Sequence, residues 1–352
     1  TTTYRSLDLV GFDPGLLVVG SPPMGQAGAP RLGTFGPPVI EFMELPPVTG
    51  QEPELWAPRI AAYANPWAGV DVYRADGGGG WTFVTTVETP AIMGELTSPL
   101  YAGPVDRWDR GNTVYVRFYG AANLLTLAEG QVLGGAGAIG VKNAAGAWEV
   151  LQYETATLTG QNTYALSKLL RGQLGTEGAM ANPVAAGARV VVLDANTLTP
   201  LDTVLDNRTL AQDLRYGPSL YPVTDPTYTE TTVQGAPVGL RPFSVSQIAG
   251  SRDPASGDVT VTWERRTRYA GDSWDPPSVP LNEDEEAYDL ELLDDAGAVI
   301  RTAASLPGPS WVYPTAEQAA DFGAVRYAYT VNVYQLSVLY GRGQVATRTV
   351  YL

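Results

Sequence analysis

Hydrophobic and polar residues alternate with a period of two along much of this 352-residue chain, in short runs. Valine, threonine, tyrosine and tryptophan dominate these runs, and glycine, asparagine or proline residues separate them. Such residues on a two-residue period predict β-strands joined by turns. We therefore expect an all-β protein built from several small β-domains, with strands near residues 70–75, 81–89, 113–119, 147–158 and 188–194.

The last third of the chain has the pattern of a β-sandwich. Val259, Val261 and Trp263 alternate with polar residues, residues 287–303 form a hairpin pattern around an Asp-Ala-Gly turn, and residues 325–336 alternate over a full strand. An early strand with an inward tryptophan and a late tyrosine-rich strand are typical of small sandwich domains. The change of texture near Gly239 predicts a domain over residues 239–352.

Two short helices are expected between the strands. Thr126 and Glu129 have the spacing of a capping box, with threonine as N-cap, and Gly134 ends the helix if Gly130 does not end it sooner. A second helix is predicted over residues 315–322, stopped by Gly323. Neither is long enough to change the all-β assignment.

The beginning of the chain differs from the rest. Residues 1–36 contain the pair Pro22-Pro23 and further prolines, and proline fixes φ and removes a hydrogen-bond donor. We therefore expect an extended strap, lying across its own domain or reaching another subunit. Residues 37–125 and 126–238 are expected to be two β-domains. The chain begins without methionine or an apolar leader, and is expected to be part of a longer polypeptide.

Composition excludes several classes of function. The formal net charge of −15 disfavours binding to nucleic acid or to anionic lipid, and no apolar run reaches the length of a membrane span. The absence of cysteine and histidine excludes thiol nucleophiles, Ser-His-Asp triads and the usual zinc sites. We expect no cofactor, no metal and no catalytic residue.

Carboxylates are the remaining candidates for acid–base chemistry. Asp106 and Asp109 in "DRWDRGN" each lie beside an arginine, which favours the ionised form and opposes the raised pKa that a general acid needs. We interpret this segment as a structural turn held by Asp–Arg contacts. The four acids of residues 283–286 lack the spacing of a calcium loop and are interpreted as a solvated loop.

The glycine-rich sequences are also interpreted as structural. Residues 135–140 match G-x-G-x-x-G, but a helix pattern precedes the motif and a strand follows, the reverse of a dinucleotide site. In "LSKLLRGQLGTEGAM" no Gly-Lys-Ser/Thr ending follows, so a phosphate loop is not predicted. We expect a structural turn formed by Arg171, Gly172, Gly175 and Glu177, with Arg171 pairing with Glu177 across it.

Several segments together resemble one protein family. They are "PPVIEFMELP", "DRWDRGN", "NTYALSKLLRGQLGTEGAM", "GLRPFSVSQ", "VTVTWERRTRYAGDSW" and "YPTAEQAADFGAVRYAYTVNVYQLS". In this order they resemble the C-terminal half of the large baseplate hub ("megatron") proteins of rhodobacterial gene transfer agents and related siphophages. The resemblance extends over about residues 37–336 and implies that residues 239–352 are a fibronectin type III-like domain.

The resemblance also implies a function. Members of this family are virion proteins that form a threefold hub closing the tail tube, so it implies a non-enzymatic structural part of a tail tip or baseplate, made in the bacterial cytoplasm. The implied partners are two further copies of the chain, other tail-tip proteins, and a host receptor or polysaccharide. Tyr269 and Trp274, in a polar proline-rich loop, are candidate host contacts, or else they cap the sandwich. The alternatives are a carbohydrate-active module acting on capsule or cell wall, and a bacterial surface adhesin.

Overall fold

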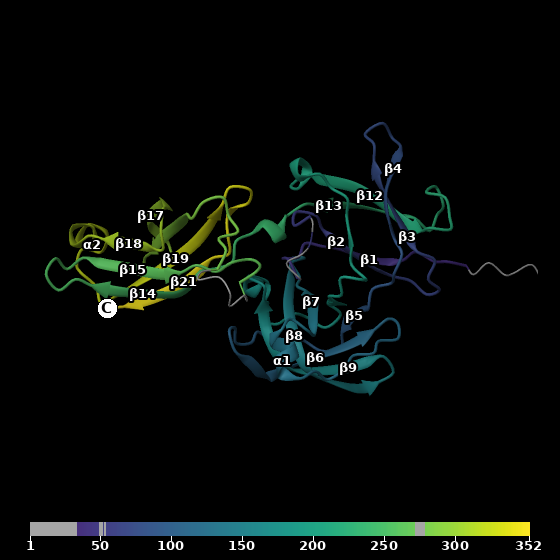
Figure 1. Cartoon of the computed structure of the whole chain (residues 1–352), viewed down its shortest axis with the longest axis horizontal. Helices are drawn as coiled ribbons and strands as arrows, with labels where there is room; N and C mark the ends of the chain where they lie inside the picture. The colour runs from purple at the N-terminus through teal and green to yellow at the C-terminus, as the bar shows by residue number, and fades with distance from the viewer. Residues whose placement is uncertain (1–33, 49–51, 53, 272–278) are drawn as a thin grey trace, which may run out of the picture. The chain divides into compact units, whose positions relative to one another are not determined.

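The computed structural model describes residues 34–48, 52, 54–271 and 279–352, and the chain is all-β over this part. Its strands form a closed barrel, two open sheets beside it and a C-terminal sandwich (Figure 1). Nearly all of the expected strap, and Trp274, lie outside the described residues. No helix among the described residues is long and apolar enough to cross a membrane.

The barrel is closed by antiparallel pairing around the order β10-β5-β6-β9-β8-β7, with β10 pairing with β7. Valine and leucine side chains fill its core, among them Val114, Val116, Leu151 and Leu166, each fully buried. Closure leaves no free strand edge in this part of the chain. The strands are β5 (Met93–Leu96), β6 (Trp108–Phe118), β7 (Ala138–Lys142), β8 (Trp148–Gly160), β9 (Thr163–Gln173) and β10 (Arg189–Val192).

Two open sheets are formed by strands from both sides of the barrel sequence. The first has the order β1-β2-β11 and the second β13-β12-β3-β4. The expected boundary between residues 125 and 126 lies inside the barrel, and β12 pairs with β3 across it. The strands are β1 (Val39–Met43), β2 (Arg59–Tyr63), β3 (Val70–Ala75), β4 (Trp81–Val87), β11 (Thr199–Pro200), β12 (Ala211–Pro218) and β13 (Thr229–Gln234).

The C-terminal strands form a β-sandwich of two sheets. One sheet has the order β14-β15-β18; in the other, β17, β16 and β19 lie side by side, and β20 and β21 both pair with β19. Trp263 points into its core, as the alternating pattern predicts, and meets Tyr288 there edge to face. The strands are β14 (Ser246–Arg252), β15 (Val259–Glu264), β16 (Tyr288–Leu293), β17 (Val299–Leu306), β18 (Ser310–Tyr313), β19 (Ala328–Ser337), β20 (Gly341–Arg342) and β21 (Ala346–Tyr351).

The two helices differ in how well the sequence predicts them. Helix α2 (Thr315–Phe322) has the expected bounds, and Gly323 ends it in the left-handed conformation. Helix α1 (Glu129–Leu133) begins two residues later than expected, with Ala128 in place of Thr126 as N-cap. The side chain of Gln131 accepts from the Ala128 amide, while Thr126 exchanges hydrogen bonds with Ala156 on β8. Because the Thr126 hydroxyl is used in these contacts with β8, Thr126 does not cap the helix.

Candidate functional site: a buried arginine cluster in the barrel

Arg171, in the segment "LLRGQLGTE", is the largest fully buried side chain of the barrel. It lies near the end of β9 at a bulge: the register passes from Gln152–Leu170 to Val150–Gln173, so Arg171 and Gly172 together oppose Leu151. A bulge of this kind redirects side chains that a regular strand would point elsewhere. The result is a guanidinium removed from water, which requires partners for its charge.

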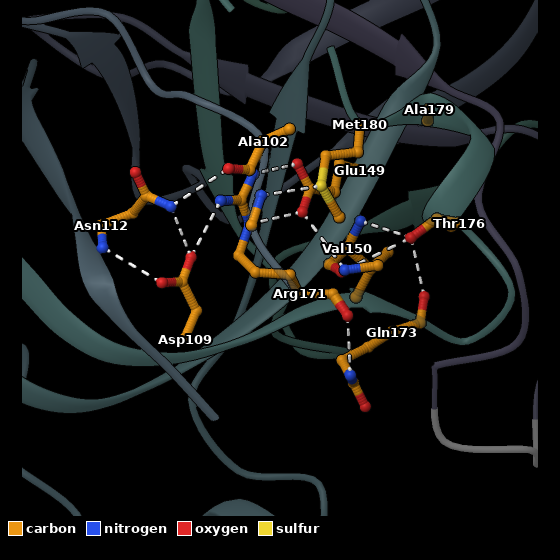
Figure 2. Close-up of polar contacts among 12 residues, drawn as sticks. Ala102, Asp109, Asn112, Glu149, Val150, Arg171, Gln173, Thr176, Ala179 and Met180 are labelled. Atoms are coloured by element: carbon orange, nitrogen blue, oxygen red, sulfur yellow. Dashed lines mark hydrogen bonds and ion pairs between the residues drawn. The ribbon is translucent and has the colours of Figure 1, made fainter. Parts of the chain in front are cut away.

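Glu149 on β8 is the main partner of Arg171. The Arg171 Nε atom donates to Glu149 Oε1 at 2.7 Å and Nη2 donates to Oε2 at 2.9 Å, which makes a two-pronged ion pair (Figure 2). The Gly172 amide donates to the same carboxylate at 3.2 Å. Both side chains of the pair are inaccessible to solvent, so its geometry is fixed by packing as well as charge.

Two segments outside the β8–β9 hairpin are attached to the same guanidinium. Arg171 Nη1 donates to the Tyr101 carbonyl at 2.9 Å and contacts Asp109 Oδ2 at 3.4 Å. One side chain thus links the loop after β5, the start of β6, β8 and β9. We call Arg171, Glu149, Asp109 and the Tyr101 carbonyl the arginine cluster.

Asp109 is held in the ionised form within this cluster. Burial by itself raises the pKa of a carboxyl group, but hydrogen bonds from the Asn112 side chain and from the Asn112 and Gly111 amides, together with Arg171, outweigh it and lower the pKa of Asp109. The Asn112 side chain donates at 2.7 Å (Figure 2). The expected Asp–Arg contact therefore exists, but the arginine is Arg171 and not the adjacent Arg107 or Arg110.

The turn after Arg171 is present, but the expected ion pair across it is not. Gly172 and Gly175 have positive φ angles of 56° and 72°, and a Cβ atom at Gly175 would overlap the Phe243 ring. Glu177 instead accepts from Ser244 and contacts Arg266 Nη1 at 3.3 Å. Arg171 is directed to Glu149 by its bulge, so Glu177 is left to bind the segment that enters the sandwich.

The cluster residues that sequence reasoning missed are Glu149 and the Tyr101 carbonyl. Glu149 lies between Trp148 and Val150, at the start of six consecutive buried residues of β8. A single charge within a buried run such as WEVLQY is a signal for a buried ion pair, because a lone buried charge is too costly. The Tyr101 carbonyl gives no signal, since any residue carries one.

The remaining candidates are placed as follows. Tyr269 is half-buried, and its amide donates to Asn282 at 3.0 Å, which ties the loop to the next segment. Glu283, expected in a solvated loop, is buried against Arg268 at 2.9 Å, and burial raises its pKa although Arg268 opposes the rise. Asp106 is exposed. Trp274 lies outside the described residues.

The contacts of the arginine cluster are those of a structural ion-pair network that joins several segments of the barrel. Asp109 has a lowered pKa and Glu149 accepts hydrogen bonds from Arg171 and the Gly172 amide, whereas a general acid needs a raised pKa and access to substrate. The guanidinium has no face open to a ligand, because Arg171 is 0 % exposed. Within the part of the chain that the structure covers, no group of three or more acidic side chains is placed to hold a metal ion.

Comparison with known proteins gives one family match, and it coincides with the barrel. Residues 91–191 match the family described as "Rcc01698-like, C-terminal". The match begins just before β5 and ends within β10, so it includes every residue of the arginine cluster. No curated protein matches the chain.

Two of the solved structures that match are remote in sequence. A two-domain fibronectin type III segment of chicken tenascin is 10 % identical, with 73 % of this chain and 99 % of that one covered and a TM-score of 0.20. The BSP domain of a biofilm-associated protein is 9 % identical, with 90 % and 82 % covered and a TM-score of 0.20. Both TM-scores are too low to support an argument about fold or function.

Proposed function

We propose that this chain is a structural part of a phage-like tail tip or baseplate hub, of the gene transfer agent or siphophage type. In this role it contributes to closure of the tail tube and to attachment to the host. It acts as a homotrimer with other tail-tip proteins, and it is located in the virion after synthesis in the bacterial cytoplasm.

The observation that carries the proposal is the agreement between the family match and the motifs. "DRWDRGN" supplies Asp109 and "LLRGQLGTEGAM" supplies Arg171, and both lie within the matched residues 91–191. These motifs, which carry the resemblance to baseplate hubs, are the ones whose side chains meet in the arginine cluster. A barrel clamped from several segments is suited to bearing mechanical load, because its strands are joined by side chains as well as by ladder hydrogen bonds.

The chemistry of the cluster supports a non-enzymatic role. The carboxylates that the sequence offered for catalysis are Asp106 and Asp109; the first is exposed in a loop and the second is buried with a lowered pKa. A carbohydrate-active module would need a carboxyl of raised pKa near a substrate groove. We therefore retain that module only as the alternative to be tested.

The proposal is tested by locating the chain in particles. An epitope inserted at the exposed tip of the β3–β4 hairpin, within Gly77–Gly79, leaves the described core untouched and is accessible to antibody. We expect labelled density at the tail tip of particles purified from the producing bacterium. Tagged chain that is absent from purified particles, or found along the capsid, would contradict the proposal.

The enzymatic alternative has its own assay. The purified chain is incubated with host capsule or cell-wall polysaccharide, and new reducing ends are measured. We expect none above a heat-treated sample. Reducing ends that disappear in the Asp106→Asn variant would establish the carbohydrate-active alternative instead.

A further inference from the structure

A cavity of 840 Å³ lies where the turn after Arg171 meets the first and last strands of the sandwich. Its walls come from the loop before β6, the end of β9, the β14 strand and the start of β21. A volume of this size is within the range of about 300–1,000 Å³ that is usual for sites of small-molecule ligands. The arginine cluster does not use this space, because Arg171 is absent from its lining.

Positive charge collects in this cavity although the chain as a whole is acidic. Its lining contains Arg107, Arg266 and Arg348 against two acids, Asp106 and Glu177, a balance of +1 from 3 − 2, whereas the whole chain carries −15. At physiological salt, charges farther away than about 8 Å are largely screened. An anion in the cavity therefore experiences mainly the charges of the lining, whose balance is +1.

The three arginines are not equivalent. Arg266 is already positioned, since its Nη1 contacts Glu177 at 3.3 Å and donates to Ser244 at 3.1 Å. Arg107 and Arg348 are exposed, and neither has an ion-pair partner among the described residues. These two guanidinium groups are available for a ligand. Arg107 lines the cavity from the barrel, and Arg348 lines it from the sandwich.

Both walls of the cavity are formed at β-bulges. On the barrel side the bulge in β9 precedes Gln173, which lines the cavity. On the sandwich side β14 has a second bulge, where Gln247 and Ile248 oppose the single residue Trp263, and Gln247 adopts a positive φ of 52°. Bulges are over-represented beside binding sites, and residues with unfavourable φ gather at ligand contacts.

The neutral polar residues of the lining are suited to hydroxyl groups. Gln173, Gln247, Ser246 and Thr347 present amide and hydroxyl side chains, each able to donate and to accept hydrogen bonds. Such side chains, beside cations that lack partners, match a ligand that carries many hydroxyl groups and a few negative charges.

We propose that this cavity binds an anionic saccharide. Its carboxylate or phosphate groups pair with Arg107 and Arg348, and its hydroxyl groups bind the glutamine, serine and threonine side chains. The inference names the class of host component that the proposed attachment function would contact, and rests on that function for its biological role. Binding in solution is independent of whether the chain is found in a tail, so the two can fail separately.

The test is calorimetric titration of the purified full chain with trigalacturonate, at low and high salt. The fully methyl-esterified trisaccharide serves as the neutral control, and mannose 6-phosphate and inorganic phosphate serve as the phosphate probes. We expect trigalacturonate or mannose 6-phosphate to bind, the tighter of the two identifying the anionic group, and binding to weaken as salt rises. The methyl ester is expected to bind at least about tenfold more weakly, since hydrogen bonds to charged groups contribute roughly 1.5–3 kcal/mol.

The variant Arg107→Ala/Arg348→Ala removes both available cations. We expect its affinity for the anionic saccharide to fall by about 100-fold, from two lost charge-assisted contacts. The matched control, Arg110→Ala/Arg117→Ala, removes two exposed barrel arginines outside the cavity and changes net charge equally. Its affinity is expected to be unchanged.

Several results would overturn the proposal. One is equal weakening by both double variants, which would mean non-specific attraction. Others are equal binding of the methyl ester, or no binding of any saccharide probe. Inorganic phosphate that binds as tightly as the saccharides would indicate an adventitious ion only, and would overturn it as well.

Discussion

Replacing Arg171 with alanine is the most direct test of the arginine cluster. The change removes both hydrogen bonds to Glu149, the one to the Tyr101 carbonyl and the contact with Asp109. Glu149 is then a carboxylate with no solvent exposure, and the Gly172 amide is the one donor that remains to it among the hydrogen bonds described here. Breaking a buried ion pair by removal of one partner costs about 3–5 kcal/mol.

That free energy corresponds to roughly two to four powers of ten in the opening equilibrium of the barrel, at about 1.4 kcal/mol per factor of ten. Hydrogen exchange measured by mass spectrometry detects it locally. We expect amides of β8 and β9 to exchange faster by about that factor in Arg171→Ala, if they exchange through opening of the barrel. Peptides from β16 and β19 serve as internal reference, since the sandwich has its own core.

Two further variants make the experiment decisive. Arg117→Ala removes an exposed arginine of β6 and is expected to change stability by no more than about 0.5 kcal/mol. Arg171→Met combined with Glu149→Leu removes both members of the main pair, and is expected to be less destabilised than Arg171→Ala because the Glu149 carboxylate is no longer left without its cation, while Asp109 keeps its hydrogen bonds from Asn112 and Gly111 in both variants. An acceleration below about tenfold for Arg171→Ala would refute the reasoning, since a cost under ~1.4 kcal/mol is too small for a buried pair.

Two other predictions concern the turn and the pH dependence. Gly175→Ala is expected to loosen the contact between the turn and Phe243, because the position has a φ of 72° and no room for a Cβ atom; increased proteolysis near residues 235–245, relative to Gly77→Ala at an open hairpin tip, would reveal it. Asp109 has a lowered pKa, so its contribution to stability is present above the ordinary value of 3.8 and is lost as pH falls through the lower folded-state pKa. The Asp109 contribution to barrel protection is therefore expected to be lost in that acidic range, with a shallower decline in Asp109→Asn; an equal decline in both proteins would contradict this assignment.

Local patterns predicted much of the fold. The strands near residues 70–75, 147–158 and 325–336 and the helix at 315–322 are confirmed, because side-chain alternation and glycine stops act within a few residues. The predicted domain boundary at residue 125 falls between two strands of one barrel, and local patterns could not reveal this. Domain boundaries depend on pairings such as β6 with β9 and β3 with β12, which join residues far apart in the chain and leave no local trace.

The candidate site, like the fold, was predicted only in part. The glycine turn and the ionised state of Asp109 were accessible to sequence reasoning, since Gly172 and Gly175 and the flanking arginines are visible in the motifs. The partner of Arg171 was not, because the bulge in β9 decides which way the side chain points. Gly172 within the strand pattern is a signal for a bulge, but the register of the two paired strands decides which side chain the bulge redirects.

The open sheet β13-β12-β3-β4 has a consequence for handling and assembly of the protein. Its outer strand β4 has the sequence WTFVTTV, with no charged residue and no proline, and Phe83 is 53 % exposed. The other outer strand, β13, carries Glu230 and is mostly polar. An uncharged, β-prone strand edge is a template for intermolecular pairing. We therefore expect isolated chains to self-associate through β4 at high concentration. The variant Thr85→Lys, which places a charge on this edge strand, is expected to slow that self-association.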